Sequence, residues 1–244
     1  MKNLLFSLIY YICKFPTFIR AELFLNKVKS SENRSFFNSS SSLHKDGFDV
    51  IDTFLPDYLV QQILSVSSFN YDQHVNSVDI PSHLQNELHA LVHHHLGDYI
   101  ESYLGGSYFL YRTVLKTVNN NISKRSISSF WHYDLVGRRL KLFFYLNSCT
   151  SVSTVISKST HLSYKPPFYP VSRFLFYLSS FFKHRANIRV FPDPSKILLF
   201  DTNTYHKASI SSSSNPESRV TVQIDIMLKS KYSLLAHNGH LLGL

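Results

Sequence analysis

The sequence predicts a mainly β protein with α-helices on its N-terminal side, and three observations lead to this prediction. The chain has 244 residues, 44% hydrophobic and 17% charged, so one all-β domain with a buried core is expected. After Gly106, β-branched and aromatic residues occur in short runs separated by Ser, Asn and Pro turns. Before Gly105, the apolar residues recur at helical spacing. Short strands after a helical lead indicate a β-sandwich or barrel with helices packed outside it.

The predicted helical region begins near residue 44. A short strand is predicted around Phe48–Ile51, followed by a helix that starts at Pro56 or Asp57 and ends at Leu64. Between residues 82 and 104 the apolar side chains fall on one helical face, and Gly105-Gly106 ends that helix as a C-terminal cap would.

Two histidines of this long predicted helix, His89 and His93, are four residues apart and share a face. That spacing can hold a metal ion, but neither a third ligand nor an HExxH motif accompanies them. A structural or solvent-facing role is therefore preferred for both.

The β part of the chain is predicted to consist of short strands. They are rich in residues that favour extended backbone. The predicted strands cover residues 107–118, 127–134, 139–147, 152–157, 187–191, 196–201 and 218–228.

Composition and charge exclude several classes of protein. The sequence contains neither GxGxxG nor GxxxxGK[ST], and its only cysteines, Cys13 and Cys149, cannot form a disulfide framework or a cysteine-based zinc site. The net charge is +9, but residues 1–45 carry seven basic and two acidic side chains, which is +5 of that excess. The positive charge therefore belongs mainly to a tail, and no nucleic-acid partner is expected.

Residues 1–43 form an N-terminal segment separate from the domain predicted at 44–244. Residues 4–13 are apolar and lie between Lys2 and Lys14, a run too short to span a membrane. Three interpretations remain open: a helix docked on the domain, a helix in the membrane interface, or a signal peptide, although no small-x-small cleavage site follows. Residues 30–43 are rich in Ser and Asn and indicate a linker.

His132, Asp134 and His206 are the candidate metal ligands. On a strand, His132 and Asp134 point to the same side, because side chains alternate along an extended chain. His206 follows the apolar strand predicted at residues 197–200, and a turn is expected after it. Two histidines and one carboxylate form the facial triad that binds non-haem iron(II) and leaves coordination positions open. A His-x-Asp tripeptide alone is a weak signal.

Residues 218–228 add a second signal. Arg219, Thr221, Gln223 and Asp225 alternate with Val220, Val222, Ile224 and Ile226. The strand therefore has one apolar face and one face of hydrogen-bonding groups, which suits the lining of a cavity. The planar guanidinium of Arg219 fits a carboxylate there, and the hydroxyl of Thr221 shares its face.

The order His132-x-Asp134, His206, Arg219-x-Thr221 resembles that of the 2-oxoglutarate- and iron(II)-dependent oxygenases. Four further segments are similar to the phytanoyl-CoA dioxygenase family: DGFDVIDTFLPDYLV, KLFFYLN, SKSTHLS and FDTNTYHKAS. The resemblance covers about residues 44–228. It departs from the family at residues 158–161, which lack the usual turn glycine.

The resemblance implies a double-stranded β-helix, also called a jelly-roll or cupin-like core, with N-terminal helices. It implies Fe(II) held by His132, Asp134 and His206, with 2-oxoglutarate and O2 as cosubstrates and Arg219 with Thr221 at the distal carboxylate. The expected enzyme is a dioxygenase that hydroxylates a small organic or lipid-like substrate and releases succinate and CO2. Halogenating relatives replace the carboxylate of the triad, so Asp134 favours hydroxylation.

Residues 164–185 carry many aromatic and basic side chains, and they form either a substrate-facing lid or a helix packed on the sheet. The alternative function is a non-catalytic jelly-roll binding protein at a membrane surface, supported by this segment and by residues 1–30. A relative that binds iron without turnover is a third hypothesis. A cytoplasmic location is expected, with peripheral membrane contact through residues 1–30 as one option.

Overall fold

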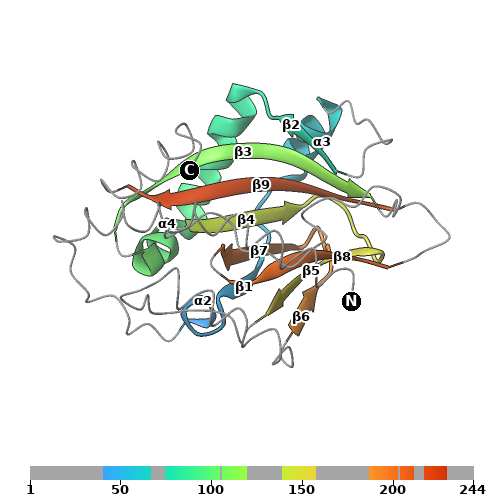
Figure 1. Ribbon diagram of the computed structural model, residues 1–244. Coiled ribbons are helices and arrows are strands. Elements are labelled where there is room, and N and C mark those ends of the chain that lie inside the picture. The colour runs from blue at the N-terminus through green and yellow to red at the C-terminus, as the bar shows by residue number, and fades with distance from the viewer. Residues whose placement is uncertain are drawn as a thin grey trace, which may run out of the picture.

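The structure is a computed structural model, and it describes the chain in seven segments. They are residues 41–66, 75–104, 106–119, 139–157, 187–202, 204–211 and 217–229. Within these segments a large and a small antiparallel sheet form a jelly-roll-like core, and helices pack on the large sheet (Figure 1). The predicted fold class, a mainly β jelly roll with N-terminal helices, is confirmed.

The helices of the described chain are α2 (Ser42–Asp46), α3 (Asp57–Ser65) and α4 (Ser82–Leu104). The long predicted helix is confirmed, and its buried residues recur every four positions along one stripe: Leu84, Leu88, Val92, Leu96, Ile100 and Leu104. After its last turn, the Gly106 amide donates to the Glu101 carbonyl at 3.2 Å, the long-reach bond of a helix C-terminal cap. Gly105 lies outside the described residues.

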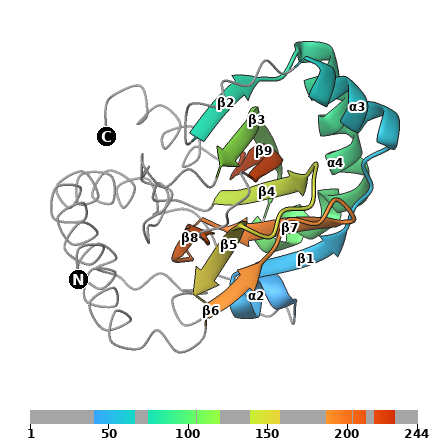
Figure 2. The same ribbon diagram turned by 90° about the vertical axis from the view of Figure 1, so that its right-hand side faces the viewer.

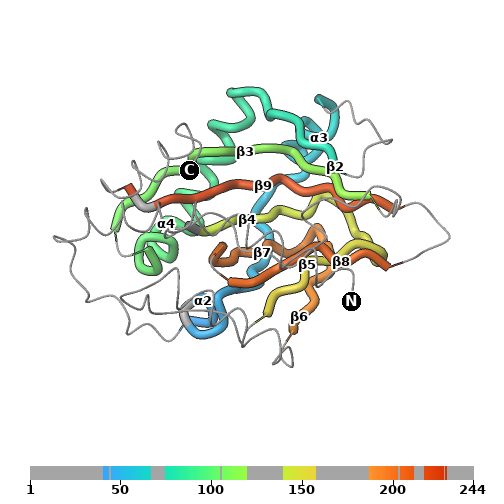
Figure 3. The backbone as a smooth tube through the Cα atoms, viewed as in Figure 1, coloured from blue at the N-terminus to red at the C-terminus, as the bar shows by residue number. Residues whose placement is uncertain are grey.

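The large sheet has the strand order β1-β7-β4-β9-β3-β2, and the small sheet has the order β6-β5-β8. The strands are β1 (Phe48–Asp52), β2 (Val75–Asp79), β3 (Tyr108–Asn119), β4 (Arg139–Tyr145), β5 (Val152–Ser157), β6 (Asn187–Val190), β7 (Lys196–Asp201), β8 (His206–Ile210) and β9 (Ser218–Leu228). Every pairing is antiparallel. Figure 3 follows β9 through the middle of the large sheet, between β4 and β3.

The two faces of the large sheet have different neighbours. Figure 2 shows α3 and α4 on one side of the sheet and the small sheet on the other. A large apolar cluster joins Leu142, Leu199 and Ile224 to the buried stripe of α4. A smaller cluster joins Phe143 and Phe200 of the large sheet to Ile156 of β5. The side chains between the two sheets therefore form a compartment separate from the helix-facing core.

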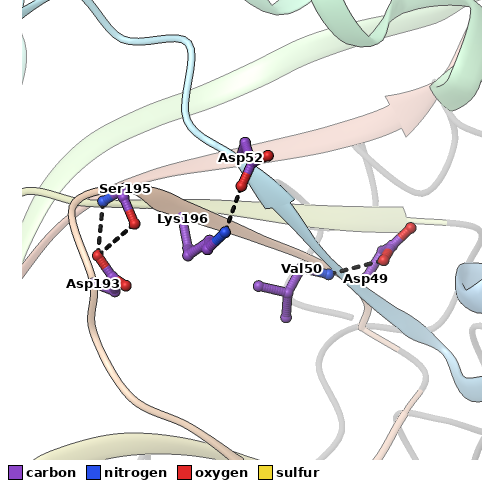
Figure 4. A network of polar contacts seen from close by, with 6 residues as sticks. All are labelled: Asp49, Val50, Asp52, Asp193, Ser195 and Lys196. Carbon is purple, nitrogen blue, oxygen red and sulfur yellow. Dashed lines mark hydrogen bonds and ion pairs between the residues drawn. The ribbon is translucent and has the colours of Figure 1, made fainter.

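The outer edge of the large sheet, strand β1, is joined to β7 by polar contacts at the strand ends. The Lys196 ammonium pairs with the Asp52 carboxylate, and the Thr53 amide donates to the Ser195 carbonyl at 2.8 Å. The Ser195 amide and hydroxyl both donate to Asp193, at 2.9 and 2.8 Å (Figure 4). The Asp52 side chain is 85% exposed, so the ion pair contributes little to stability. Strand β1 is held mainly by its backbone pairing with β7.

His89 and His93 take the structural role that was preferred for them. His89 Nε2 lies 2.7 Å from Thr113 Oγ1 on β3, and His93 Nδ1 lies 2.7 Å from the Tyr108 hydroxyl. Burial lowers the pKa of His89, and the charge of His93 lowers it further. These contacts tie α4 to β3.

Strands β1, β3, β4, β5, β6, β7 and β9 confirm predicted strands. The turn expected after His206 was wrong, because the turn precedes this histidine and β8 begins at it. Strand β2 was not predicted. The strand predicted at residues 127–134 and the segment 164–185 lie outside the described residues, as do residues 1–40 of the N-terminal segment. Leu43 already belongs to the helix-facing core. Within the described residues, no helix is long and apolar enough to cross a membrane.

Candidate functional site

The inner face of the large sheet, which faces the small sheet, carries the polar side chains predicted on β9. Arg219, Thr221, Gln223 and Asp225 are all buried, as is Lys141 of the neighbouring strand β4. In register, Lys141 lies opposite Asp225, and Phe143 lies opposite Gln223. Strand alternation therefore places a row of hydrogen-bonding groups inside the jelly roll, as predicted.

His206 is buried at the first position of β8. Its Nδ1 lies 2.8 Å from the carbonyl oxygen of Thr204, which can only accept a hydrogen bond. In the neutral ring the proton therefore sits on Nδ1, and Nε2 carries the lone pair that a metal ion requires. The ring packs edge-on against Phe200 at 4.8 Å between centroids, so its orientation is fixed from two sides.

The turn before His206 is fixed by both sheets and by α4. The Thr204 amide donates to the Asp201 carbonyl at 2.8 Å, and the Tyr103 hydroxyl donates to the Asp201 carboxylate at 2.5 Å. The Ser157 amide of β5 donates to the Tyr205 carbonyl at 2.9 Å. These contacts fix the position of His206.

Arg219 is a buried cation whose hydrogen-bonding groups are only partly used. Its Nη1 donates to Thr154 Oγ1 at 2.8 Å, and its guanidinium carbon lies 5.7 Å from the centre of the Phe143 ring. Its Nε has no hydrogen-bond partner among the described residues. Burial lowers the pKa of Arg219, because desolvation disfavours the charged form. An anionic ligand would compensate both the charge and the unused donor.

Thr221 is fully buried beside Arg219, but its hydroxyl already has a protein acceptor. Its Oγ1 donates to the Lys116 carbonyl on β3 at 3.2 Å. The prediction that this hydroxyl binds the cosubstrate carboxylate requires the hydroxyl to rotate away from that carbonyl, and it stays a prediction.

Aromatic rings connect Arg219 to His206 across the inner face. The ring of Phe143, over which the guanidinium lies, is 5.3 Å from that of Phe200. Phe200 in turn contacts His206. The two polar groups predicted for different parts of one site therefore border the same apolar wall, which comes from β4 and β7.

The other two predicted iron ligands, His132 and Asp134, lie outside the described residues. Within the described segments, no group of three His, Cys, Asp or Glu side chains is arranged to hold a metal ion. The three-residue metal site therefore stays a prediction, of which the structure describes one member, His206.

Thr154 and Lys141 were missed as members of this row of polar groups. Thr154 lies in a strand that is buried along its whole length, and its contact with Arg219 joins residues 65 positions apart. Lys141 did carry a signal, because it is the one charged residue in the otherwise apolar run of residues 140–146. A lone charge in a buried strand indicates an internal partner, here Asp225 at 3.8 Å.

No family model matches the sequence, and no curated protein matches it. Solved structures match its fold. SnoN, a non-heme alpha-ketoglutarate-dependent epimerase from nogalamycin biosynthesis, gives a TM-score of 0.54 at 15% identity over 76% of this chain and 79% of its own. HygX from Streptomyces hygroscopicus, with nickel, 2-oxoglutarate and hygromycin B bound, gives 0.53 at 15% identity over 81% and 88%. EctD from S. alaskensis, with 2-oxoglutarate and 5-hydroxyectoine, gives 0.52 at 13% identity over 82% and 80%. At these identities the likeness shows a shared fold.

Proposed function

We propose that this chain is an iron(II)- and 2-oxoglutarate-dependent oxygenase. In this proposal His132, Asp134 and His206 bind the iron, Arg219 binds the distal carboxylate of 2-oxoglutarate, and Thr221 assists. The fold is shared with SnoN, HygX and EctD, all three of which have been solved with 2-oxoglutarate (alpha-ketoglutarate). The same fold hosts many functions, so the side chains of the site decide which function this chain has.

The state of Arg219 is the observation that carries the proposal. A buried guanidinium with an unused Nε is costly unless a ligand supplies the missing negative charge. The carboxylate of a dicarboxylic acid fits such a group, because its two oxygens match the planar donor fork. The Phe143 ring covers one face of the guanidinium, so a carboxylate would approach Arg219 in the plane of its N–H donors.

The fit of iron to the described part of the site rests on His206. Its tautomer is fixed by the Thr204 carbonyl, and a neutral imidazole held in this way is a standard ligand for non-haem iron. When bound, the iron and O2 would supply the oxidising chemistry, with 2-oxoglutarate converted to succinate and CO2.

The chain's own residues would orient the cosubstrate and keep the site dry. Arg219 fixes one end of 2-oxoglutarate, and the Tyr103–Asp201 contact holds the turn that presents His206. Phe143 and Phe200 form the apolar wall between them and exclude water. Hydroxylation of a small organic or lipid-like substrate, and membership of the phytanoyl-CoA dioxygenase family, are finer hypotheses within this proposal, since SnoN is an epimerase on the same fold.

Anaerobic titration of the purified protein tests the proposal. Iron(II) is added first and 2-oxoglutarate second, while the visible charge-transfer absorption of the chelated complex is recorded. We expect the band in the wild-type protein, its loss in His206→Ala, and a right-shifted 2-oxoglutarate titration in Arg219→Met. The shift is at least about tenfold, because a charge-assisted hydrogen bond contributes about 1.5–3 kcal/mol.

Matched controls come from exposed residues of the same types. His94→Ala on α4 and Arg189→Met on β6 change the composition identically and should leave both titrations unaltered. A folded wild-type protein that binds iron but gives no band with 2-oxoglutarate would contradict the cosubstrate assignment. The alternative, a non-catalytic protein at a membrane surface, would then be tested by liposome sedimentation with and without residues 1–30.

A further inference from the structure

A group of three buried polar side chains lies on the inner face of the large sheet, and the proposed iron and 2-oxoglutarate sites do not use it. The group consists of Gln223 and Asp225 on β9 and Lys141 on β4, with 6%, 2% and 8% of their surfaces exposed. A buried polar side chain in a jelly-roll interior is costly unless it is fully hydrogen-bonded.

The contacts within the group fix the orientation of the Gln223 amide. Gln223 Nε2 donates to Asp225 Oδ1 at 3.4 Å, and Lys141 Nζ lies 3.8 Å from the same oxygen. A carboxylate only accepts hydrogen bonds, so the NH2 end of the amide must face it and the carbonyl end must face away. The flipped amide would bring two acceptors together.

Gln223 Oε1, the end that faces away, has no hydrogen-bond partner among the described residues. A protein that only needed to fill this position could place an apolar side chain there, as it does at the neighbouring Phe143. A buried acceptor that the protein leaves unpaired is available to a ligand that donates a hydrogen bond.

The group lies next to the proposed site. Gln223 is in register with Phe143, the residue under the Arg219 guanidinium. Lys141 is in register with Phe200, the residue that packs on His206. The polar group therefore borders the same aromatic wall as both proposed ligand-binding residues, at positions that neither of them occupies.

The charges in the group determine what it can accept. Lys141 and Asp225 compensate one another, so together they offer no net charge to attract an ion. Apolar chains are also disfavoured, because they would leave Oε1 unpaired. The remaining class is a neutral molecule that donates a hydrogen bond, and beside Lys141 a hydroxyl group suits this position because it both donates and accepts.

We propose that Gln223 determines substrate specificity by accepting, through Oε1, a hydrogen bond from a hydroxyl group of a neutral, polar substrate. This inference rests on the proposed function and narrows its substrate class from small organic or lipid-like molecules to hydroxylated ones. Asp225 acts as a positioning residue, because it holds the amide in the orientation that presents Oε1.

The first test separates a ligand-binding role from a structural one without any substrate. Gln223→Met replaces the amide by an apolar side chain of similar length, and Gln61→Met makes the same change at an exposed position of α3. If Oε1 awaits a ligand, Gln223→Met loses only the long bond to Asp225, so its melting temperature stays within about 4 °C of the wild type. A larger fall in Gln223→Met, with no change in Gln61→Met, would mean that the amide is structural and would overturn the proposal.

The second test uses two sets of probes on the protein loaded with iron(II) and 2-oxoglutarate. Sorbitol, inositol and glucose represent hydroxylated compounds, and decanoic acid represents a lipid-like one. We expect at least one hydroxylated probe to raise the melting temperature anaerobically and to accelerate succinate release in air. In Gln223→Met, about tenfold or more of the probe should be needed for the same response, whereas Gln61→Met should respond as the wild type does.

The experiments distinguish a failure of the proposed oxygenase function from a failure of the proposed role of Gln223. If the wild-type protein forms no iron–2-oxoglutarate complex, the proposed function fails before any probe is added. If the complex forms but decanoic acid alone is active, or no hydroxylated probe has an effect, the proposed function stands and the role of Gln223 is overturned.

Discussion

The two faces of strand β9 differ in the chemistry of their side chains. Val222, Ile224 and Ile226 face the helices and belong to the large apolar cluster. Arg219, Thr221, Gln223 and Asp225 face the small sheet and are polar, and two of them, Arg219 and Gln223, carry buried atoms without a partner among the described residues. The apolar face is packed against other apolar side chains of the protein, whereas the polar face has hydrogen-bonding atoms without a partner among the described residues.

The two faces of this sheet contribute differently to stability and to ligand binding. The helix-facing side gains from apolar burial, which needs no specific partner. The inner side keeps buried polar groups that cost free energy unless they are paired. We therefore expect substitutions on the helix-facing side to lower stability, and substitutions at the unpaired inner groups to alter binding.

The largest expected effect is that of Phe144→Ala on the helix-facing side of β4. Phe144 is 1% exposed and packs edge-on against Phe54 at 5.4 Å. Removing it should cost about 3–5 kcal/mol of unfolding free energy, measured by urea denaturation. The matched variant is Phe143→Ala on the inner face, whose apolar cluster is smaller and for which we expect a smaller loss. An equal or larger loss for Phe143→Ala would show that the inner face stabilises the protein as much as the helix-facing side does.

Asn147→Ala should have the next largest effect. The Asn147 side chain accepts from the Val220 amide at 2.8 Å and donates to the Ser218 carbonyl at 2.6 Å, so it connects the end of β4 to the start of β9. Leaving these backbone groups unpaired should cost about 1–3 kcal/mol in the same measurement. Asn187→Ala on the exposed edge strand β6 is the control, and a similar loss there would show that the Asn147 contacts are not special.

Acid should weaken the helix-facing side first, through His89. Its pKa in the folded protein lies below the ordinary value of 6.5, so the unfolded chain binds a proton before the folded one does. Stability should therefore fall as the pH drops through 6.5, and His89→Gln should flatten this part of the profile. Denaturation midpoints between pH 8 and pH 5 measure this, with the exposed His83→Gln as control. A fall that is unchanged in His89→Gln would contradict the assignment.

The start of β9 should respond to acid in a lower range, through Glu217. Its carboxylate accepts from the amides of Thr150 and Ser151, both at 3.0 Å, and these bonds lower its pKa from 4.5 to about 2. The resulting stabilisation is present above pH 4.5 and is lost between 4.5 and about 2. Glu217→Gln should lack this acid-dependent component. Its persistence in the variant would assign it to another carboxylate.

The smallest expected effect on stability is that of Arg219→Met. The variant removes a buried cation that is incompletely paired, and it loses one hydrogen bond, the one from Arg219 to Thr154. Its unfolding free energy should therefore stay within about 1 kcal/mol of the wild type, or rise. A much larger loss would mean that Arg219 is structural, and it would remove the contrast between the two faces of β9.

Most of the fold was predictable because its signals are local. The stripe of α4 repeats at helical spacing, and β9 alternates at every residue, so each element is specified by its own sequence. Strands β2 and β8 are short and partly polar, and they are extended because β3 and β5 pair with them. Such pairing is a tertiary effect that no local pattern contains.

The candidate site was predictable only in part, for the same reason. The alternation of β9 placed Arg219 and Gln223 on one internal face, and the structure confirms their burial. Which groups they meet depends on register and on how the two sheets pack. The partners Thr154 and Lys141 lie on strands far away in the sequence, so only the folded chain brings them to β9.

The central position of β9 has a consequence for how the chain is made. Strand β9 lies between β3 and β4 and pairs with β3 along its whole length, although about a hundred residues separate the two in the sequence. During synthesis β3 and β4 therefore leave the ribosome long before the strand that joins them. Until residues 218–228 arrive, both have open hydrogen-bonding edges, and the nascent chain is exposed to aggregation. We therefore expect slow folding that completes only when Arg219 and Gln223 are in place.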